Sequence, residues 1–193
     1  NTRSRGLGDV YKRQFQKLFR SLGLNNIDHR TNECDFSYQD SYPIMPSLGC
    51  DINSLKDFDN IILIGVNIKS EFPILSIWLN EAVKNSTKIY SINFDSSDED
   101  FDVYYKKVIN NNELVSFFLE EKHNLDFNKN ENTIIIIGPS ISRLFNQSDI
   151  LSVIHKFCIK INSKMGFLTD YCNSTGAWTV SYTHLRAHET AYY

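Results

Sequence analysis

The sequence predicts an α/β fold in which helices cover both faces of a parallel sheet. Two apolar runs, 61–64 and 133–137, are dominated by isoleucine. Short β-branched runs without polar alternation are typical of strands buried on both faces. Each run leads into a glycine, Gly65 or Gly138, and then into a segment whose apolar residues have helical spacing. Because strand, glycine turn and helix recur in the same order, we expect a repeated α/β layer.

The first of these units, residues 60–92, predicts a complete crossover between two strands. Ser70 is the expected N-cap of its helix, and Pro73 suits the first turn, where an N–H has no intrahelical partner. Five apolar side chains at helical spacing are expected to lie on the sheet: Leu75, Trp78, Leu79, Ala82 and Val83. A third apolar run, 88–92, follows this helix and is expected to form the next strand. Gly65 marks the carboxyl edge of the sheet, where folds of this kind bind ligands.

Four further segments show helical patterns: 15–22, 51–58, 103–109 and 113–123. The first is expected to end at Gly23 in a left-handed cap, and the second to begin at Asp51 or Asn53. The Asp- and Ser-rich segment 93–102 lacks the residue order of a calcium-binding EF-hand loop. We therefore expect this segment to be a solvated loop.

The second unit begins at 133–137 and turns at Gly138. Ser148 is the expected N-cap of its helix, whose inward-facing side chains are Ile150, Ile154, Phe157, Cys158 and Ile161. Right-handed crossovers would place both glycine turns on the same edge of the sheet. The small and polar segment 173–178 then predicts a loop whose backbone approaches another group closely.

Composition excludes several classes of function. The formal net charge is −3 and the charged residues are scattered, so no basic stripe for nucleic acid is present. No apolar segment is long enough to span a bilayer and no secretory signal opens the sequence, so we expect no direct membrane insertion. The four cysteines are far apart, unlike those of a zinc or iron–sulfur site. His155 and Cys158 share a helix side, but a half-buried helix face explains them better than a metal.

Two tails, residues 1–14 and 179–193, are predicted to be foreign to the fold. One choice of codons for the first tail has a reverse complement that, in another reading frame, encodes most of the second. Such an inverted repeat resembles a sequencing-library adapter translated together with its insert. We therefore expect one partial domain over 15–178, cut at both ends, between two adapter-derived tails. This interpretation also removes His184 and His188, whose spacing would otherwise suggest a helical metal site.

Three pieces of the sequence resemble the molybdopterin-oxidoreductase superfamily. They are the loop 23–30 (GLNNIDHR), the unit 59–92 with its Gly-x-Asn turn, and the segment 166–177, which ends in Asn-Ser-x-Gly-Ala. More narrowly, the loop followed by Asp35-Phe36, together with the last segment, is similar to the large iron–sulfur subunit of bacterial NADH:quinone oxidoreductase, respiratory complex I. The resemblance implies a fragment of a molybdopterin-oxidoreductase-like domain with a Rossmann-like parallel sheet and flanking helices.

The resemblance to the complex I subunit implies that this domain is a scaffold in the peripheral arm that carries electrons from NADH to quinone, and that it has lost its metal cofactor. The resemblance implies partner subunits of that arm, no nucleic acid, and a location on the cytoplasmic face of the bacterial inner membrane. The 2Fe–2S and 4Fe–4S clusters of the parent subunit lie in other, cysteine-rich segments, so the chain itself is expected to hold no cofactor, metal or catalytic residue. By resemblance, Asn25, Asn26, Asp28, Gly65 and Asn67 form the edge of a vestigial pterin pocket.

The alternative is a catalytic relative such as a formate dehydrogenase, with molybdopterin as cofactor. Cys34 lies six residues after Asp28, about where the resemblance places a molybdenum ligand. The catalytic branch usually follows this ligand with His, whereas Asp35 follows it here. The carboxylates of Glu33 and Asp35 also disfavour a thiolate. The strand ending at Ile92 continues without the Asp and Arg pairing that catalytic relatives use for phosphate, so the complex I interpretation is preferred.

Overall fold

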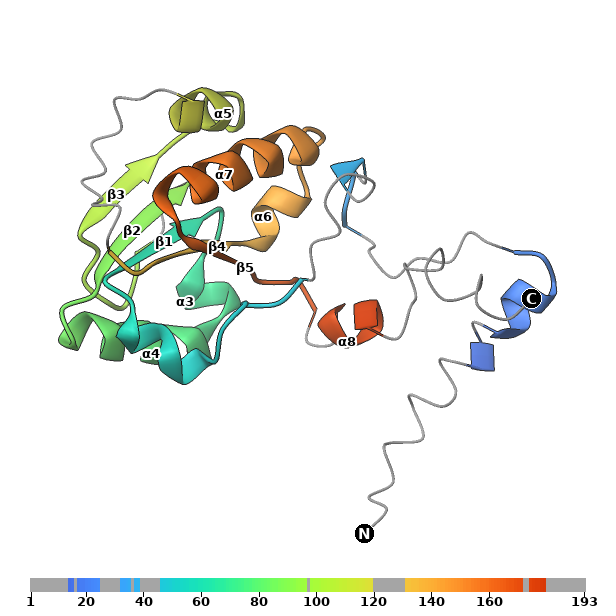
Figure 1. Ribbon diagram of the computed structural model, residues 1–193, viewed down its shortest axis with the longest axis horizontal. Helices are drawn as coiled ribbons and strands as arrows, with labels where there is room; N and C mark the ends of the chain where they lie inside the picture. Colours follow the sequence, from blue (N-terminus) through green and yellow to red (C-terminus); the bar gives the residue numbers. More distant parts are fainter. Residues whose placement is uncertain are drawn as a thin grey trace, which may run out of the picture. The chain divides into compact units, whose positions relative to one another are not determined.

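The computed structural model describes residues 14–15, 17–24, 32–35, 37–38, 46–96, 98–119, 131–171 and 174–179. The chain divides into two compact units: Asn32–Asp170 forms one, and the terminal segments Asn1–Thr31 and Tyr171–Tyr193 form the other. The larger unit holds the whole sheet (Figure 1). None of the helices in the described ranges combines the length and the hydropathy of a transmembrane span.

The sheet has five parallel strands in the order β3-β2-β1-β4-β5. The strands are β1 (Asn60–Ile64), β2 (Lys88–Asn93), β3 (Tyr105–Val108), β4 (Thr133–Ile137) and β5 (Lys164–Phe167). β1 lies at the centre, with Ile62 beside Tyr90 of β2 and beside Ile135 of β4. This confirms the α/β class and the strands expected from the three apolar runs.

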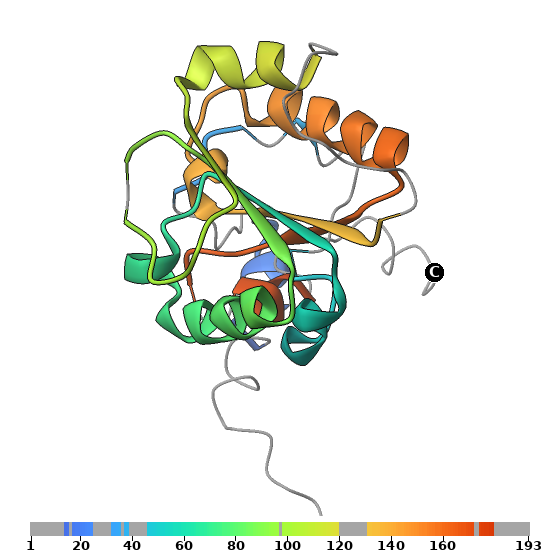
Figure 2. The same ribbon diagram turned by 90° about the vertical axis from the view of Figure 1, so that its left-hand side faces the viewer.

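Helices cover both faces of the sheet. They are η1 (Ile52–Asp57), α3 (Ile68–Glu71), α4 (Pro73–Lys84), α5 (Asn111–Leu119), α6 (Pro139–Ser142) and α7 (Gln147–Ile161). Figures 1 and 2 show α5 and α7 over one face and α3 and α4 over the other. Side chains alternate accordingly: Ile61 and Leu63 pack in the core under α4, while Ile62 and Ile64 pack in the core under α7. Each fully buried isoleucine contributes about 1.5–3 kcal/mol of transfer free energy.

The segment 103–109 contains the strand β3 rather than the predicted helix. β3 pairs with β2 at the edge of the sheet, and its residues alternate between half-buried and exposed. The inward-facing side chains meet aromatic groups: Tyr105 packs on Tyr90, and the ammonium of Lys107 lies 4.4 Å from the ring centroid of Phe117. Aromatic and β-branched residues favour a pleated, half-buried surface, and the pairing with β2 decides the conformation here.

Both predicted helix N-caps are also wrong. Ser70 lies inside α3, whose N-cap is Asn67. α4 begins separately at Pro73, which occupies the first helical position as expected. Ser148 lies inside the first turn of α7, and the residue at the N-cap, Asn146, makes no side-chain cap. Asp51, by contrast, caps η1 as predicted, by accepting a hydrogen bond from the Asn53 amide at 3.0 Å.

β5 was not expected from the sequence, because a four-residue strand with Lys, Met and Gly carries no apolar run. It is defined by its pairing with β4 on one side. On its other side, the Phe167 amide donates to the Ser47 carbonyl at 2.7 Å. A Cβ on Gly166 would lie 2.2 Å from the Leu48 carbonyl oxygen. The segment around Leu48 thus lies directly against the edge strand.

The smaller unit has two described helical pieces. Residues 17–21 are helical, and Gly23 follows with φ +78°, so the predicted left-handed cap is confirmed. The Leu24 amide donates to the Phe19 carbonyl at 3.0 Å, which completes the cap. The predicted loop 173–178 is wrong in part, because α8 runs from Ser174–Thr179. A single interior glycine costs a helix only about 1 kcal/mol, so small residues alone did not exclude this helix.

Candidate functional site

The candidate site lies where the strand order reverses, between β1 and β4. In doubly wound sheets ligands bind outside the carboxyl ends of the strands at this position. Gly65 leaves β1 with φ +62°, and its amide donates to the Ile92 carbonyl at 3.0 Å. Gly138 leaves β4, and its amide donates to the Ile64 carbonyl at 2.8 Å. The prediction that both glycine turns share one edge is therefore confirmed.

The two turns are in direct contact. A Cβ on Gly138 would lie 2.3 Å from the Gly65 carbonyl oxygen and 2.4 Å from the Val66 Cβ. The Ser140 amide also donates to the Gly65 carbonyl at 3.2 Å. Only glycine fits at 138, since no side chain could be placed there without moving backbone.

The amides that follow β1 are satisfied by side chains of the protein. The Val66 amide donates to Oδ1 of Asn93 at 2.8 Å, and Asn93 is only 3 % exposed. The Asn67 amide donates to Oε2 of Glu71 at 3.0 Å, and the Ser70 amide donates to Oδ1 of Asn67 at 3.2 Å. Asn67 and Glu71 thus resemble a capping box that closes the first turn of α3 on itself.

A polar pocket of about 270 Å³ opens beside these turns. Its lining includes the carboxylates of Glu71 and Asp95, the hydroxyl of Ser140 and the guanidinium of Arg143. Arg143 forms a close ion pair with Asp170 and a second one with Glu71 at 4.0 Å. The cation of the pocket is therefore matched by carboxylates of the chain.

These described residues do not fit the phosphate groups of a pterin dinucleotide. Phosphate sites present unengaged backbone amides and cations to the ligand. Here the amides of Val66, Asn67 and Ser70 already donate to Asn93, Glu71 and Asn67. The carboxylates in the lining would repel an anion. This matches the poor phosphate chemistry inferred from the sequence after Ile92.

Cys34 lies on an exposed segment, and its neighbour Asp35 has a defined structural role. Oδ2 of Asp35 accepts a hydrogen bond from the Ser148 amide at 2.8 Å, in the first turn of α7. The Ser148 hydroxyl in turn accepts from the Tyr38 amide at 3.0 Å and lies 2.9 Å from the Ser37 hydroxyl. Asp35 therefore supplies the cap that Ser148 was predicted to provide.

The pKa of Asp35 is well below its usual value. Burial opposes this change, but hydrogen bonds from Ser148 and Ser37 to the ionised carboxylate outweigh it. Asp35 is thus an ionised acceptor at the positive end of α7, where a carboxylate is also favoured by the helix dipole. A residue with this role holds the segment after Cys34 against the fold.

The predicted site residues have different outcomes. Gly65 and Asn67 lie at the pocket, although Asn67 acts as a helix cap there. Asn25, Asn26 and Asp28 lie outside the described residues. Sequence reasoning did not assign roles to Glu71, Asn93, Arg143 and Asp170. Two of them could have been found from the sequence. Asn93 ends a strand at the ligand edge, and Glu71 lies one helical turn after Asn67.

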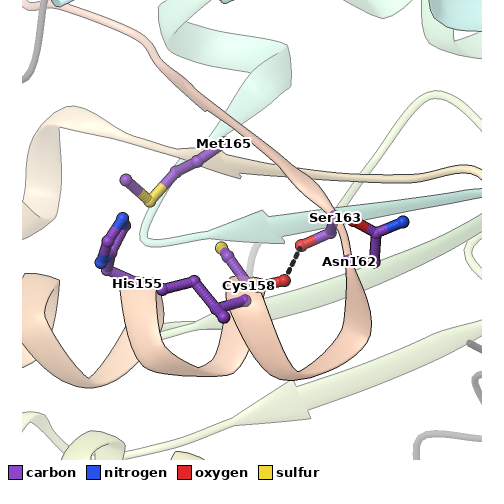
Figure 3. Close-up of a pocket in the computed structure, with 6 residues that line it drawn as sticks. His155, Cys158, Asn162, Ser163 and Met165 are labelled. Atoms are coloured by element: carbon purple, nitrogen blue, oxygen red, sulfur yellow. Dashed lines mark hydrogen bonds between the residues drawn. The ribbon is translucent and has the colours of Figure 1, made fainter.

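A second pocket, of about 380 Å³, lies between α7 and β5 and contains His155 and Cys158. Figure 3 shows both side chains on the side of α7 that faces Met165. Cys158 belongs to the core, at 4 % exposure, and burial raises the pKa of its thiol. Among the described residues, no three His, Cys, Asp or Glu side chains are grouped to hold a metal ion. The core position agrees with the helix-face interpretation.

The strand order, the paired glycine turns and the polar pocket define a doubly wound α/β domain with its ligand edge at the switch point. A model of the molybdopterin oxidoreductase family matches residues 11–190, and the chain belongs to this family. The match includes parts of both tails that were expected to be adapter-derived. A search of curated proteins found no match to the chain.

Proposed function

We propose that the chain is a segment of the large iron–sulfur subunit of a respiratory NADH:quinone oxidoreductase. In this role it is a scaffold domain of the peripheral electron-transfer arm. One observation carries the proposal. In the turn after β1, the backbone amides of Val66, Asn67 and Ser70 already donate hydrogen bonds to side chains of the same chain, so they are not available to a ligand. Such an edge favours a rigid support over a site for a phosphate-bearing cofactor.

The residue after Cys34 supports the same proposal. In the catalytic branch, the resemblance places a histidine directly after the molybdenum ligand. Here Asp35 occupies this position. Its carboxylate accepts a hydrogen bond from the Ser148 amide and so caps α7. A scaffold gains stability from such a long-range cap, whereas a molybdenum ligand gains nothing from an anion beside it.

The proposal includes the environment of the parent subunit. We propose neighbouring subunits of the peripheral arm as partners, and a position on the cytoplasmic face of the bacterial inner membrane. Electrons would pass through 2Fe–2S and 4Fe–4S clusters held by other segments of the parent. The general role as part of an oxidoreductase follows from the family.

Metal and pterin analysis of the intact parent protein tests the scaffold proposal. We expect iron in the ratio that its clusters require, with molybdenum and tungsten below one-tenth of an equivalent. The pterin fluorescence of an oxidised extract is expected to stay at background. Stoichiometric molybdenum together with a pterin would overturn the proposal, because a scaffold has no use for either.

A catalytic molybdopterin-dependent oxidoreductase, such as a formate dehydrogenase, is the second candidate. One observation favours it: the Cys34 thiol is exposed while its neighbour Asp35 is anchored to α7, so the thiol is presented from a fixed position. This candidate predicts that Cys34→Ala abolishes turnover in the full-length protein. Cys158→Ala, which removes a buried thiol of the same type, is the matched control. Unchanged activity of the Cys34→Ala variant would dispose of this candidate.

We further propose that residues 1–14 and 179–193 are adapter-derived. The inverted repeat between their possible codons supports this, and the amplified source DNA across both junctions tests it. Genomic sequence that replaces the tails and continues into cysteine-rich motifs upstream is the expected result. Genomic DNA that encodes both tails unchanged would overturn it.

A further inference from the structure

Arg143 lies at the centre of an ionic cluster beside the glycine turns. It follows α6, whose N-cap is Gly138, so the Gly138 turn places it at the carboxyl edge of β4. Its guanidinium pairs with Asp170, which follows β5, and with Glu71 at the end of α3. Carboxylates from two separate parts of the fold thus converge on one cation in the pocket.

Each carboxylate accepts a hydrogen bond in addition to its ion pair with Arg143, so this cluster differs from an ordinary surface ion pair. Oδ2 of Asp170 accepts from the Asn32 side-chain amide at 3.1 Å, and the Asp170 side chain is 14 % exposed. Oε2 of Glu71 accepts from the Asn67 amide, and the Glu71 side chain is 26 % exposed. Half-buried carboxylates with fixed geometry hold an arginine far better than mobile surface acids do.

We propose that Asp170 and Glu71 act as built-in counter-ions that close the switch-point pocket to anionic ligands by neutralising Arg143. An arginine fork is the side chain best suited to bind a phosphate. With two carboxylates of its own chain beside it, Arg143 presents no net positive charge to the pocket. The inference rests on the proposed scaffold function and explains it: carboxylates of the chain itself occupy the position beside Arg143 that an anionic ligand would take.

The inference predicts a latent anion site. The double substitution Glu71→Gln and Asp170→Asn removes both negative charges while it keeps side-chain oxygens that can accept from Asn67 and Asn32. Arg143 is then released from these two carboxylates beside the Gly65 and Gly138 turns. A charge-assisted hydrogen bond is worth about 1.5–3 kcal/mol, so we expect binding of inorganic pyrophosphate to strengthen at least about tenfold.

Isothermal titration calorimetry of the full chain with pyrophosphate tests this. A matched control, Asp57→Asn with Glu81→Gln, makes the same change in net charge on the η1 and α4 side, where both side chains are exposed. We expect saturable binding by the first variant only, and loss of this binding when Arg143→Ala is added. The single Asp170→Asn variant leaves the Asn67 cap untouched and should give a smaller gain of the same kind. Circular dichroism melting establishes that each variant is folded.

The possible results separate the two proposals. Tight pyrophosphate binding by the unmodified chain would contradict the counter-ion inference, and tight binding of a pterin dinucleotide as well would contradict the scaffold function. If neither folded variant gains affinity, or if the control gains as much, the counter-ion inference is wrong while the scaffold proposal stands. Binding that survives Arg143→Ala would also overturn it.

Discussion

The two strand–turn–helix units of the sheet contain helices that are anchored in different ways. After β1, the first turn of α3 is capped from within, because the side chains of Asn67 and Glu71 accept hydrogen bonds from backbone amides at most four residues away. After β4 the Gly138 turn leads into the short α6, and the first turn of the next helix, α7, is capped by Asp35, which lies 113 positions from Ser148 in the sequence. The first unit is therefore determined locally, and the second depends on a distant segment.

This difference connects the segment that carries Cys34 to the core of the fold. Ser37 and Tyr38 join Asp35 at Ser148, so several bonds hold the same short stretch. α7 in turn buries Ile150, Ile154 and Phe157 against the sheet. A substitution in the segment around Cys34 should therefore destabilise the core through α7. A substitution at Asn67 should destabilise only α3.

The largest effect is expected at the point where the two turns meet. Gly138→Ala would put a Cβ 2.3 Å from the Gly65 carbonyl oxygen, and only a backbone shift could relieve that contact. Overpacking of this kind should lower the free energy of unfolding by about 3 kcal/mol or more, measured by urea denaturation. Gly65→Ala is the matched variant. It combines φ +62° with a contact to the flexible Ile141 side chain at 2.9 Å, and should cost about 1–2 kcal/mol. Equal losses would show that the turns do not differ.

The next effect is expected from the long-range cap. Asp35→Ala removes the acceptor of the Ser148 amide and should destabilise the larger unit by about 1–2 kcal/mol. Asp51→Ala, which removes a local cap from η1, should cost less than half as much because that cap holds only a short 3-10 helix. Hydrogen exchange should show faster opening of α7 in the first variant and not in the second. Unchanged protection of α7 would contradict the coupling between Asp35 and this helix.

The Asp35 contribution should also depend on pH in a defined direction. Its pKa is lowered in the folded state, so the folded protein binds this proton less readily than the unfolded chain does. The stabilisation is therefore complete above the ordinary aspartate pKa of about 3.9 and is lost as the pH falls through the lower folded value. The stability difference between the wild type and Asp35→Ala should be constant from neutral pH down to that range and shrink below it. A difference that grows on acidification would have the wrong sign.

The sequence was sufficient for features that depend on local pattern. The isoleucine runs of β1 and β4 predict buried strands because they are short, rich in β-branched residues and followed by a glycine, whereas a buried helix would be longer. The stripe of α4 predicts its inward face, and Gly65 predicts the ligand edge. β3 was missed because its residues, Tyr-Lys-Lys-Val, do not alternate between apolar and polar, and only the folded sheet makes their burial alternate.

The charged features of the candidate site could not be derived in this way. The pairing of Arg143 with Asp170 spans a helix and a strand, and no spacing rule links an ion pair across such a distance. The same holds for Asp35 and Ser148, whose contact exists only once α7 is packed on the sheet. Chemistry assembled from separate elements needs the topology first, whereas Glu71 and Asn67 were within reach of a capping rule.

The smallest expected effect tests the local cap of α3. Asn67→Ala removes the oxygen that accepts from the Ser70 amide and should cost about 1 kcal/mol. Ser70→Ala, the substitution that would matter if Ser70 were the N-cap, should cost only a few tenths of a kcal/mol, because exposed positions inside a helix tolerate alanine. Urea denaturation of both variants measures the difference, and hydrogen exchange should show the change confined to α3. A larger loss for Ser70→Ala than for Asn67→Ala would reverse the assignment of the cap and with it the contrast between a self-capped α3 and a remotely capped α7.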